Sequence, residues 1–247
     1  MVRRKQEAED LGKVQKSFQR TEKKYLLQRE EYEALRCQLA PYMEEDAYGL
    51  SLIMSLYYDT EDFDLIRRSL EKPAYKEKLR LRSYGVPRDN DPVFLEIKKK
   101  CEGVVYKRRV TLGAKEAADY LAGGEKPAGK GQIMEEIDWM RRRYAPKPAA
   151  VISTDRLALF GKEDNALRVT FDFEPRGRMD DLDLRLGDRG EALLPAGMVL
   201  MELKVNGAAP LWLTDILSRG KLYPRSFSKY GTCYRRALAR RAGKEDF

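Results

Sequence analysis

The sequence predicts an α+β domain in which helices pack on the outside of an eight-stranded antiparallel β-barrel. Eight segments alternate polar and apolar residues with a period of two, as strands with two unlike faces do. Other segments space their apolar residues three or four positions apart, as amphipathic helices do. Eight strands suffice to close a barrel, and closure removes exposed sheet edges. A β-sandwich is the main alternative.

The predicted elements alternate along the chain. Strands are expected over residues 18–27, 51–58, 76–84, 92–100, 104–112, 150–160, 166–174 and 197–206. Helices are expected over 28–39, 61–70, 131–144, 211–220 and from 228 onward. The first two helices rest on apolar residues at helical spacing, namely Tyr32, Leu35 and Leu39, then Phe63, Ile66 and Leu70. Residues 1–17 read as a charged lead-in, 18–240 as one domain and 241–247 as a tail.

Composition excludes several classes of protein. No apolar run approaches the roughly 20 residues that span a bilayer, and the N-terminus lacks the apolar centre of a secretory signal, so a cytoplasmic location is expected. Three scattered Cys argue against a disulfide framework or a thiolate metal site. The absence of His excludes His-based catalysis and the usual zinc sites. A net charge of +8 suggests an anionic partner.

The polar faces of the predicted strands concentrate Lys and Arg. In the run 78–82, Lys78, Arg80 and Arg82 share one face, opposite two leucines. The same alternation recurs in later strands and places these residues on polar faces: Glu96, Lys98, Lys100, Lys107, Arg109, Arg168, Thr170, Asp172, Glu202 and Lys204. For any one strand, a solvated outer face explains this pattern. Because the opposite faces are bulky and suited to helix packing, the charged faces are expected to point inward.

A wet interior lined with like charges is tolerable only if a polyanion is its intended occupant, because close like charges repel. Arg offers paired donors to phosphate oxygens and Lys a compact charge. A chain of phosphates would satisfy many of these side chains at once. Tyr57 and Tyr58 are expected to pack rather than to stack on a base. No helix-turn-helix, zinc module or RNP-like aromatic pattern is present, so nucleic acid is not an expected partner.

The order of these motifs resembles the VTC domain, the polyphosphate polymerase branch of the triphosphate tunnel metalloenzymes. The motifs are Glu22-Lys23-Lys24-Tyr25, Tyr58-Asp59-Thr60, Lys78 to Arg82, Glu96-Ile97-Lys98, Tyr106 to Arg109, Arg168 to Asp172, Glu202-Leu203-Lys204 and Ser228-Lys229-Tyr230. The resemblance runs from about Phe18 to Arg236. It implies an eight-stranded tunnel that holds a triphosphate, a carboxylate-bound divalent metal, and transfer of the γ-phosphate of ATP to a growing polyphosphate chain.

The resemblance also implies roles for individual residues. Catalysis falls to Arg80, Arg82, Lys98, Arg168 and Lys229. Substrate binding falls to Lys24, Lys78, Lys107, Arg109, Arg156, Lys204 and Ser228. Mn²⁺ or Mg²⁺ would be held by Glu202, with Glu22 a weaker candidate and Asp172 weaker still. From the residues alone, Arg156 could instead have a local surface role, because Asp155 is adjacent and the phase of the strand is uncertain, and Ser228 could be only a helix N-cap.

This sequence departs from the wider superfamily at Arg20, where a carboxylate is usual, and that change favours the polymerase branch over the hydrolases. Two alternative functions remain open: a triphosphatase of the same fold and a non-catalytic polyphosphate-binding module. No transmembrane or phosphate-sensing domain is apparent in the sequence. Regulation and membrane coupling would therefore come from other chains, such as a membrane-protein partner.

Overall fold

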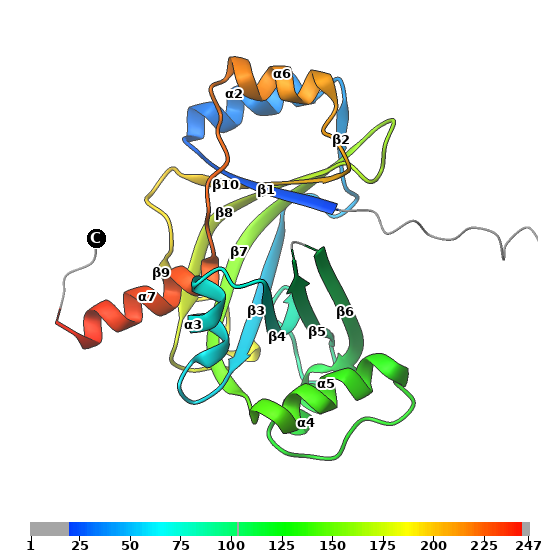
Figure 1. Ribbon diagram of the computed structural model, residues 1–247, viewed down its shortest axis with the longest axis vertical. Coiled ribbons are helices and arrows are strands. Elements are labelled where there is room, and N and C mark those ends of the chain that lie inside the picture. The colour runs from blue at the N-terminus through cyan, green and yellow to red at the C-terminus, as the bar shows by residue number, and fades with distance from the viewer. Residues whose placement is uncertain (1–19, 103, 244–247) are drawn as a thin grey trace, which may run out of the picture.

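The computed structural model describes residues 20–102 and 104–243, and these residues form an antiparallel sheet of ten strands with helices on both of its faces (Figure 1). Eight strands lie along one hydrogen-bonded path in the order β1-β10-β8-β7-β3-β4-β5-β6, and the short strands β2 and β9 pair with β7 and β8. The predicted antiparallel sheet is confirmed. The predicted eight-stranded closed barrel is not, because within the described residues the path ends at β1 and β6 without pairing them.

The long strands follow the predicted segments closely. They are β1 (Arg20–Leu27), β3 (Ser51–Asp59), β4 (Tyr75–Tyr84), β5 (Pro92–Cys101), β6 (Val104–Gly113), β7 (Lys147–Gly161), β8 (Arg168–Arg178) and β10 (Val199–Asn206). The alternation did not reveal β2 (Met43–Glu45) and β9 (Glu191–Ala192), which are too short to show a period. The predicted lead-in, and residues 18 and 19 of the first predicted strand, lie outside the described residues.

The helices are α2 (Arg29–Leu39), α3 (Asp64–Leu70), α4 (Ala114–Leu121), α5 (Gly131–Tyr144), α6 (Leu211–Arg219) and α7 (Lys229–Arg241), with a 3₁₀ turn η1 (Leu184–Leu186). Helix α3 begins three residues later than predicted, because Phe63 has a φ of 58° and stands before the first helical turn.

Two apolar clusters fix which side of the sheet faces outward. Helices α2 and α6 pack against β1, β8 and β10 through a core that includes Leu39, Phe171 and Leu213. Helices α4 and α5 pack against β3, β4, β5 and β6 through Ile137, Leu79 and others. Both clusters use the apolar face of the alternating strands. The opposite, charged face is therefore left on the inside of the curved sheet.

A third apolar cluster lies at one end of this inner face. Ala150 and Ile152 of β7 share their face with Arg156, and they pack against Tyr230 and Cys233 of α7 and Ile66 of α3. Helices α3 and α7 therefore cover one end of the charged interior. This packing was not predicted from the sequence.

Asp59, at the end of β3, joins both of these helices. Its side chain accepts hydrogen bonds from the backbone N–H groups of Leu65 and Ile66, at 2.9 and 3.0 Å, and from the Tyr230 hydroxyl at 2.8 Å. The carboxylate is fully buried, and it meets the first N–H groups of α3, which the helix itself leaves unpaired. One buried carboxylate thus holds α3 and α7 to the end of β3.

Candidate functional site

The predicted strand residues lie on one face of the sheet, as the pairing register demonstrates. Starting at the first strand, Glu22 pairs with Lys204, and Lys204 pairs with Arg168. At the other end of the path, Lys78 pairs with Lys98, and Lys98 with Lys107. Directly paired residues in an antiparallel ladder point to the same side.

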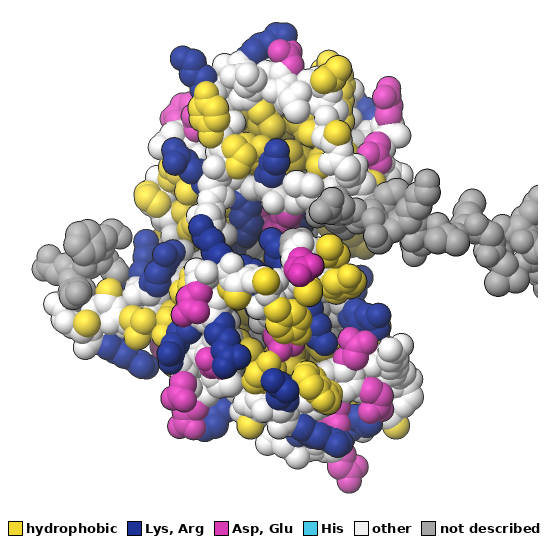
Figure 2. All heavy atoms as spheres, in the orientation of Figure 1, with side chains coloured by type: hydrophobic (Ala, Val, Ile, Leu, Met, Phe, Trp, Pro, Cys, Tyr) yellow, Lys and Arg dark blue, Asp and Glu magenta, His cyan; other side chains and the backbone are white. Residues whose placement is uncertain are grey.

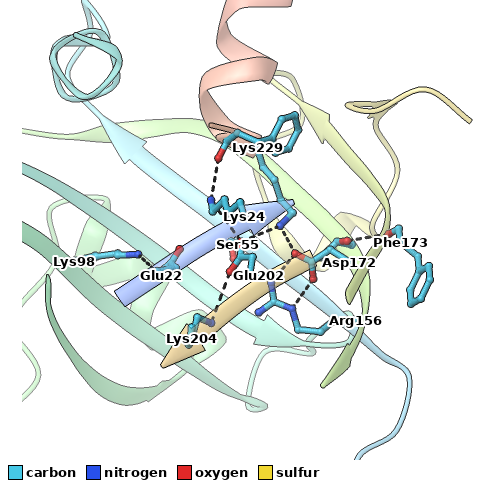
Figure 3. A network of polar contacts seen from close by, with 12 residues as sticks. Glu22, Lys24, Ser55, Lys98, Arg156, Asp172, Phe173, Glu202, Lys204 and Lys229 are labelled. Atoms are coloured by element: carbon cyan, nitrogen blue, oxygen red, sulfur yellow. Dashed lines mark hydrogen bonds and ion pairs between the residues drawn. The ribbon is translucent and has the colours of Figure 1, made fainter. Parts of the chain in front are cut away.

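An ion pair joins β1, at one end of the path, to β5, the strand next to the other end. Lys98 Nζ of β5 lies 3.3 Å from Glu22 Oε2 of β1, so the charged faces of the first strand and of β5 confront each other (Figure 3). Figure 2 shows Lys and Arg side chains gathered in a hollow between the upper part of the molecule, with α2 and α6, and the lower part. Arg80, Lys98 and Arg168 are therefore not scattered over unrelated surfaces.

Positive charge dominates this interior. Among the described residues, the cations on this face are Lys24, Lys76, Lys78, Arg80, Arg82, Lys98, Lys100, Lys107, Arg109, Arg156, Arg168, Lys204 and Lys229. Its carboxylates are Glu22, Glu96, Asp172 and Glu202. Cations therefore far outnumber carboxylates on this face, in keeping with the net charge of +8 for the whole chain. Like charges 4 Å apart repel by about 4 kcal/mol at an effective dielectric constant of 20, so an anion in the interior would relieve strong repulsion.

The first group of charges surrounds Glu202 of β10. Its carboxylate is 8% exposed and lies 3.5 Å from Lys24 Nζ, 3.7 Å from Lys204 Nζ and 3.7 Å from Lys229 Nζ (Figure 3). Burial raises the pKa of Glu202, but the three lysines outweigh it and hold that pKa well below the usual range. Glu202 is therefore ionised, and its charge is shared among three cations.

Asp172 of β8 adjoins this group and is fully buried. Its two oxygens accept hydrogen bonds from Arg156 Nε at 2.5 Å and from Arg156 Nη2 at 2.7 Å, and it also pairs with Lys229. Arg156 therefore lies in the charged interior. The neighbouring Asp155 instead pairs with Arg176, at 3.0 Å. The alternative of a local surface role for Arg156 is wrong, because its guanidinium binds the fully buried Asp172 on the inner face.

Lys229 reaches these carboxylates from the first turn of α7. The helix begins here because Ser228 is its N-cap, and the Ser228 hydroxyl accepts a hydrogen bond from Gly231 N at 3.2 Å. Lys24 donates a 2.9 Å hydrogen bond to the Phe227 carbonyl just before this helix. The start of α7 is thus fastened to β1 and β8, and Ser228 uses its hydroxyl as a cap.

The second group of charges surrounds Glu96 of β5, which is 1% exposed. Arg80 Nη2 lies 2.7 Å from Glu96 Oε2, and Lys107 Nζ lies 2.7 Å from Glu96 Oε1. Burial raises the pKa of Glu96, but Arg80, Arg82 and Lys107 lower it to about 2. Glu96 was not a predicted site residue. Glu96 is paired with Arg80 on one side and with Arg109 on the other, and this pairing identifies Glu96 as part of the site.

Replacement of Glu96 by Gln is expected to change the dependence of stability on pH. The folded pKa of about 2 lies below the unfolded value of 4.5, so the ionised Glu96 stabilises the fold above pH 4.5. That stabilisation, about 3 kcal/mol at most, is lost as the pH falls toward 2. Urea unfolding at several pH values should show a wild-type advantage over Glu96→Gln that shrinks on acidification. Glu61→Gln, at an exposed ion pair, is the control. A pH-independent difference would contradict this assignment.

Several cations have no carboxylate partner among the described residues. Arg82 donates a 3.3 Å hydrogen bond to Ser55 Oγ, and Arg109 stacks on the Phe94 ring at 4.6 Å. Within the described part of the chain, Lys78 and Arg168 form no hydrogen bond or ion pair with a carboxylate, and Arg168 is exposed at the start of β8. Burial and neighbouring cations lower the pKa of Lys78 to about 8. These groups are available to an incoming anion.

Tyr57 is a residue whose polar role was missed. Its ring does pack, stacked on Tyr230 with a centroid distance of 4.8 Å. Its hydroxyl, however, accepts a 3.2 Å hydrogen bond from Arg80 and lies among the cations. The only hint in the sequence was that Tyr57 alternates with the polar Ser55; the pairing of these two residues with Arg80 and Arg82 is visible only in the structure.

The carboxylates provide few protein ligands for a metal. Among the described residues no group of three or more Cys, Asp or Glu side chains is placed to hold an ion. Asp172 is engaged by Arg156 and Lys229, which leaves Glu202 and Glu22. Hard oxygen ligands suit Mg²⁺ or Mn²⁺, and such ions commonly combine one or two carboxylates with substrate phosphates. The residues therefore fit a divalent ion that is shared with a phosphate ligand.

Comparison with protein families agrees with this geometry. Residues 19–238 match the model of the VTC domain. The chain belongs to the VTC domain family. The matched residues include every strand and all the residues of the charged interior, so the VTC domain covers nearly all of the described structure. No curated protein matches this VTC domain.

Solved structures with a similar arrangement include two distant ones. A candidate adenylate cyclase from Vibrio parahaemolyticus is 12% identical, with a TM-score of 0.47, and the alignment covers 88% of this chain and 98% of the other. HpAC1 from Hippeastrum, a candidate adenylyl cyclase described with a dominant triphosphatase activity, is 16% identical, with a TM-score of 0.46 and coverages of 91% and 96%. Within the described part of the chain, no helix is both long and apolar enough to cross a membrane.

Proposed function

We propose that this VTC domain is a metal-dependent polyphosphate polymerase that transfers the γ-phosphate of ATP to a growing polyphosphate chain in its basic interior. The observation that supports the proposal is the concentration of cations on one inner face, of which Lys78, Arg82 and Arg168 have no carboxylate partner among the described residues. A single phosphate would leave many of these cations unsatisfied. A run of phosphates would neutralise them along the length of the interior.

Phosphoryl transfer depends mainly on positioning and charge neutralisation, which these residues provide. Arg80 and Arg82, two residues apart on β4, would grip one phosphate group, while Lys98 and Arg168 would grip another. Lys229, at the start of α7, would neutralise charge near Glu202. An acceptor phosphate is already ionised near neutral pH, so the transfer needs no strong general base, which is consistent with a chain without His.

A divalent ion would be held by Glu202, with support from Glu22, and would neutralise charge on the phosphate oxygens when bound. Side chains of the protein would also bind the phosphates directly, without the ion. The lysines around Glu202 lie 3.5–3.7 Å from the carboxylate, close enough to bind a phosphate oxygen beside it. Helices α3 and α7 cover one end of the interior with apolar side chains, which would limit the access of bulk water to a bound phosphate chain from that end.

Incubation of the purified protein with ATP and Mn²⁺, followed by separation of the products by size, tests the proposal. We expect ladders of polyphosphate together with ADP. Release of orthophosphate without polymer would support the triphosphatase instead. Polyphosphate binding without consumption of ATP would support a non-catalytic binding module. Repetition with Mg²⁺ and with tripolyphosphate as primer identifies the metal and the acceptor.

A further inference from the structure

Tyr57 occupies the end of the interior that α3 and α7 cover. It lies on β3 opposite Arg80 of β4 and Ala150 of β7. Its ring is stacked on Tyr230 of α7 with an interplanar angle of 19°, and the Arg80 guanidinium lies 5.9 Å from the ring centroid. These contacts fix the ring, so its hydroxyl is held in one place among the charged residues.

The hydroxyl of Tyr57 has an unused hydrogen-bond donor. It accepts a hydrogen bond from Arg80 Nη1 at 3.2 Å, and a phenol can both accept and donate. No acceptor for its own proton is found among the described residues. A phosphate oxygen that entered this end of the interior could receive that proton.

Cations from β4 surround the hydroxyl. They are Arg80, Lys78 and Arg82, and the carboxylate that pairs with Arg80, Glu96 of β5, is also paired with Lys107. Burial raises the pKa of Tyr57, but the cations outweigh burial and lower it to about 7. An ionised Tyr57 would offset part of the positive charge in an empty interior.

The other elements packed on Tyr57 contribute mainly uncharged side chains, and the buried carboxylate of Asp59 already accepts hydrogen bonds from Tyr230 and from the backbone of α3. Helix α7 contributes Tyr230 and Cys233, and burial is the first cause that raises the pKa of both groups, that of Cys233 to about 11. Asp59 lies behind Tyr230 and hydrogen-bonds to it. Helix α3 contributes apolar side chains, including Ile66. The cations of β4 therefore control the charge state of Tyr57.

We propose that Tyr57 is a further phosphate-binding residue, whose hydroxyl donates a hydrogen bond to an oxygen of a triphosphate or polyphosphate in the interior. When the interior is empty, the surrounding cations of β4 favour release of the hydroxyl proton to solvent. The bound phosphates neutralise the cations that favour the phenolate, so the O–H bond forms again with a proton taken from solvent. The restored hydroxyl then donates to a phosphate oxygen. This inference rests on the proposed function, because it requires that the interior bind a phosphate chain.

Ultraviolet absorption of tyrosinate tests the empty state without any turnover. In a titration of the ligand-free protein we expect one tyrosine to ionise with a midpoint near neutral pH, well below the other tyrosines. Tyr57→Phe should remove this transition. Tyr58→Phe is the matched control, because Tyr58 is adjacent, lies on the outer face and has a pKa raised by burial. A wild-type titration without an early transition would overturn the proposal, whether or not the variants fold.

Addition of tripolyphosphate at about pH 8 tests the bound state. The tyrosinate band should disappear on binding. Calorimetry in buffers of different ionisation enthalpy should show about one more proton taken up by the wild type than by Tyr57→Phe, with affinity about fivefold weaker in the variant. If calorimetry detects binding but the band persists, Tyr57 is not a phosphate-binding residue. If tripolyphosphate does not bind at all, the proposed function fails, and the phosphate-binding role of Tyr57 fails with it.

Discussion

Replacement of Arg80 by Ala is expected to weaken tripolyphosphate binding by about 1,000-fold and to abolish turnover of ATP. Arg80 is held by Glu96, with contacts of 2.8 Å from Nε and 2.7 Å from Nη2, and by Tyr57. These partners fix the guanidinium on the inner face before any ligand arrives, so its charge is preorganised for phosphate. An Arg that neutralises a transferring phosphoryl group can contribute about 1,000-fold or more to the rate.

Calorimetric titration with tripolyphosphate measures the loss in affinity directly. Arg219→Ala is the matched control, because Arg219 lies on the surface of α6, paired with Asp215, and is 75% exposed. Arg80→Lys retains a positive charge but loses the paired donors, so an intermediate affinity is expected. Thermal unfolding of each variant identifies any loss of fold. Near-normal binding by a folded Arg80→Ala protein would refute the assignment of Arg80.

Replacement of Glu202 by Gln is expected to affect turnover and binding in opposite directions. Turnover of ATP with Mn²⁺ should fall by about 1,000-fold, because the proposed metal ligand loses its charge. Binding of tripolyphosphate without metal should strengthen about tenfold, because Lys24, Lys204 and Lys229 are then released from their carboxylate. A residue with only a structural role would not separate the two quantities in this way.

Paired measurements of ATP turnover and of metal-free tripolyphosphate affinity distinguish these outcomes for Glu202→Gln. Glu33→Gln provides the same chemical change at an exposed ion pair on α2. Unchanged turnover in Glu202→Gln would rule out Glu202 as the metal ligand. A loss of both turnover and metal-free binding would instead indicate that Glu202 organises the lysines for phosphate.

Much of the fold could be predicted because alternation along a strand is a local property. The leucines between Lys78, Arg80 and Arg82 determine which face of β4 packs against helices, and the structure follows that pattern. Closure of the sheet is not local. It depends on strand tilt and curvature that bring the first and last strands together, and no single segment encodes them. The sequence therefore indicated the strands but not the open path from β1 to β6.

The residues of the site could be predicted where charged and apolar side chains alternate along a strand. The inward position of Arg156 became clear only from the pairing of β7 with β8, because the carboxylate that binds Arg156 belongs to Asp172 on β8. Tyr57 and Glu96 were missed for related reasons. An aromatic residue next to Tyr58 resembles a core residue, and a carboxylate between cations resembles an ordinary surface mixture. Their roles emerge only when β3, β4 and β5 are placed side by side.

The Lys98–Glu22 ion pair has a consequence for the width of the interior. Where a cylinder of strands is closed by backbone hydrogen bonds, its girth is fixed, and widening it would break several of them. Here the contact between β1 and β5 is made by two side chains that are 37% and 25% exposed. A pair of this kind contributes about 0–1 kcal/mol and is weakened by salt. This contact between β1 and β5 can therefore separate at small energetic cost, and it is weaker at higher ionic strength.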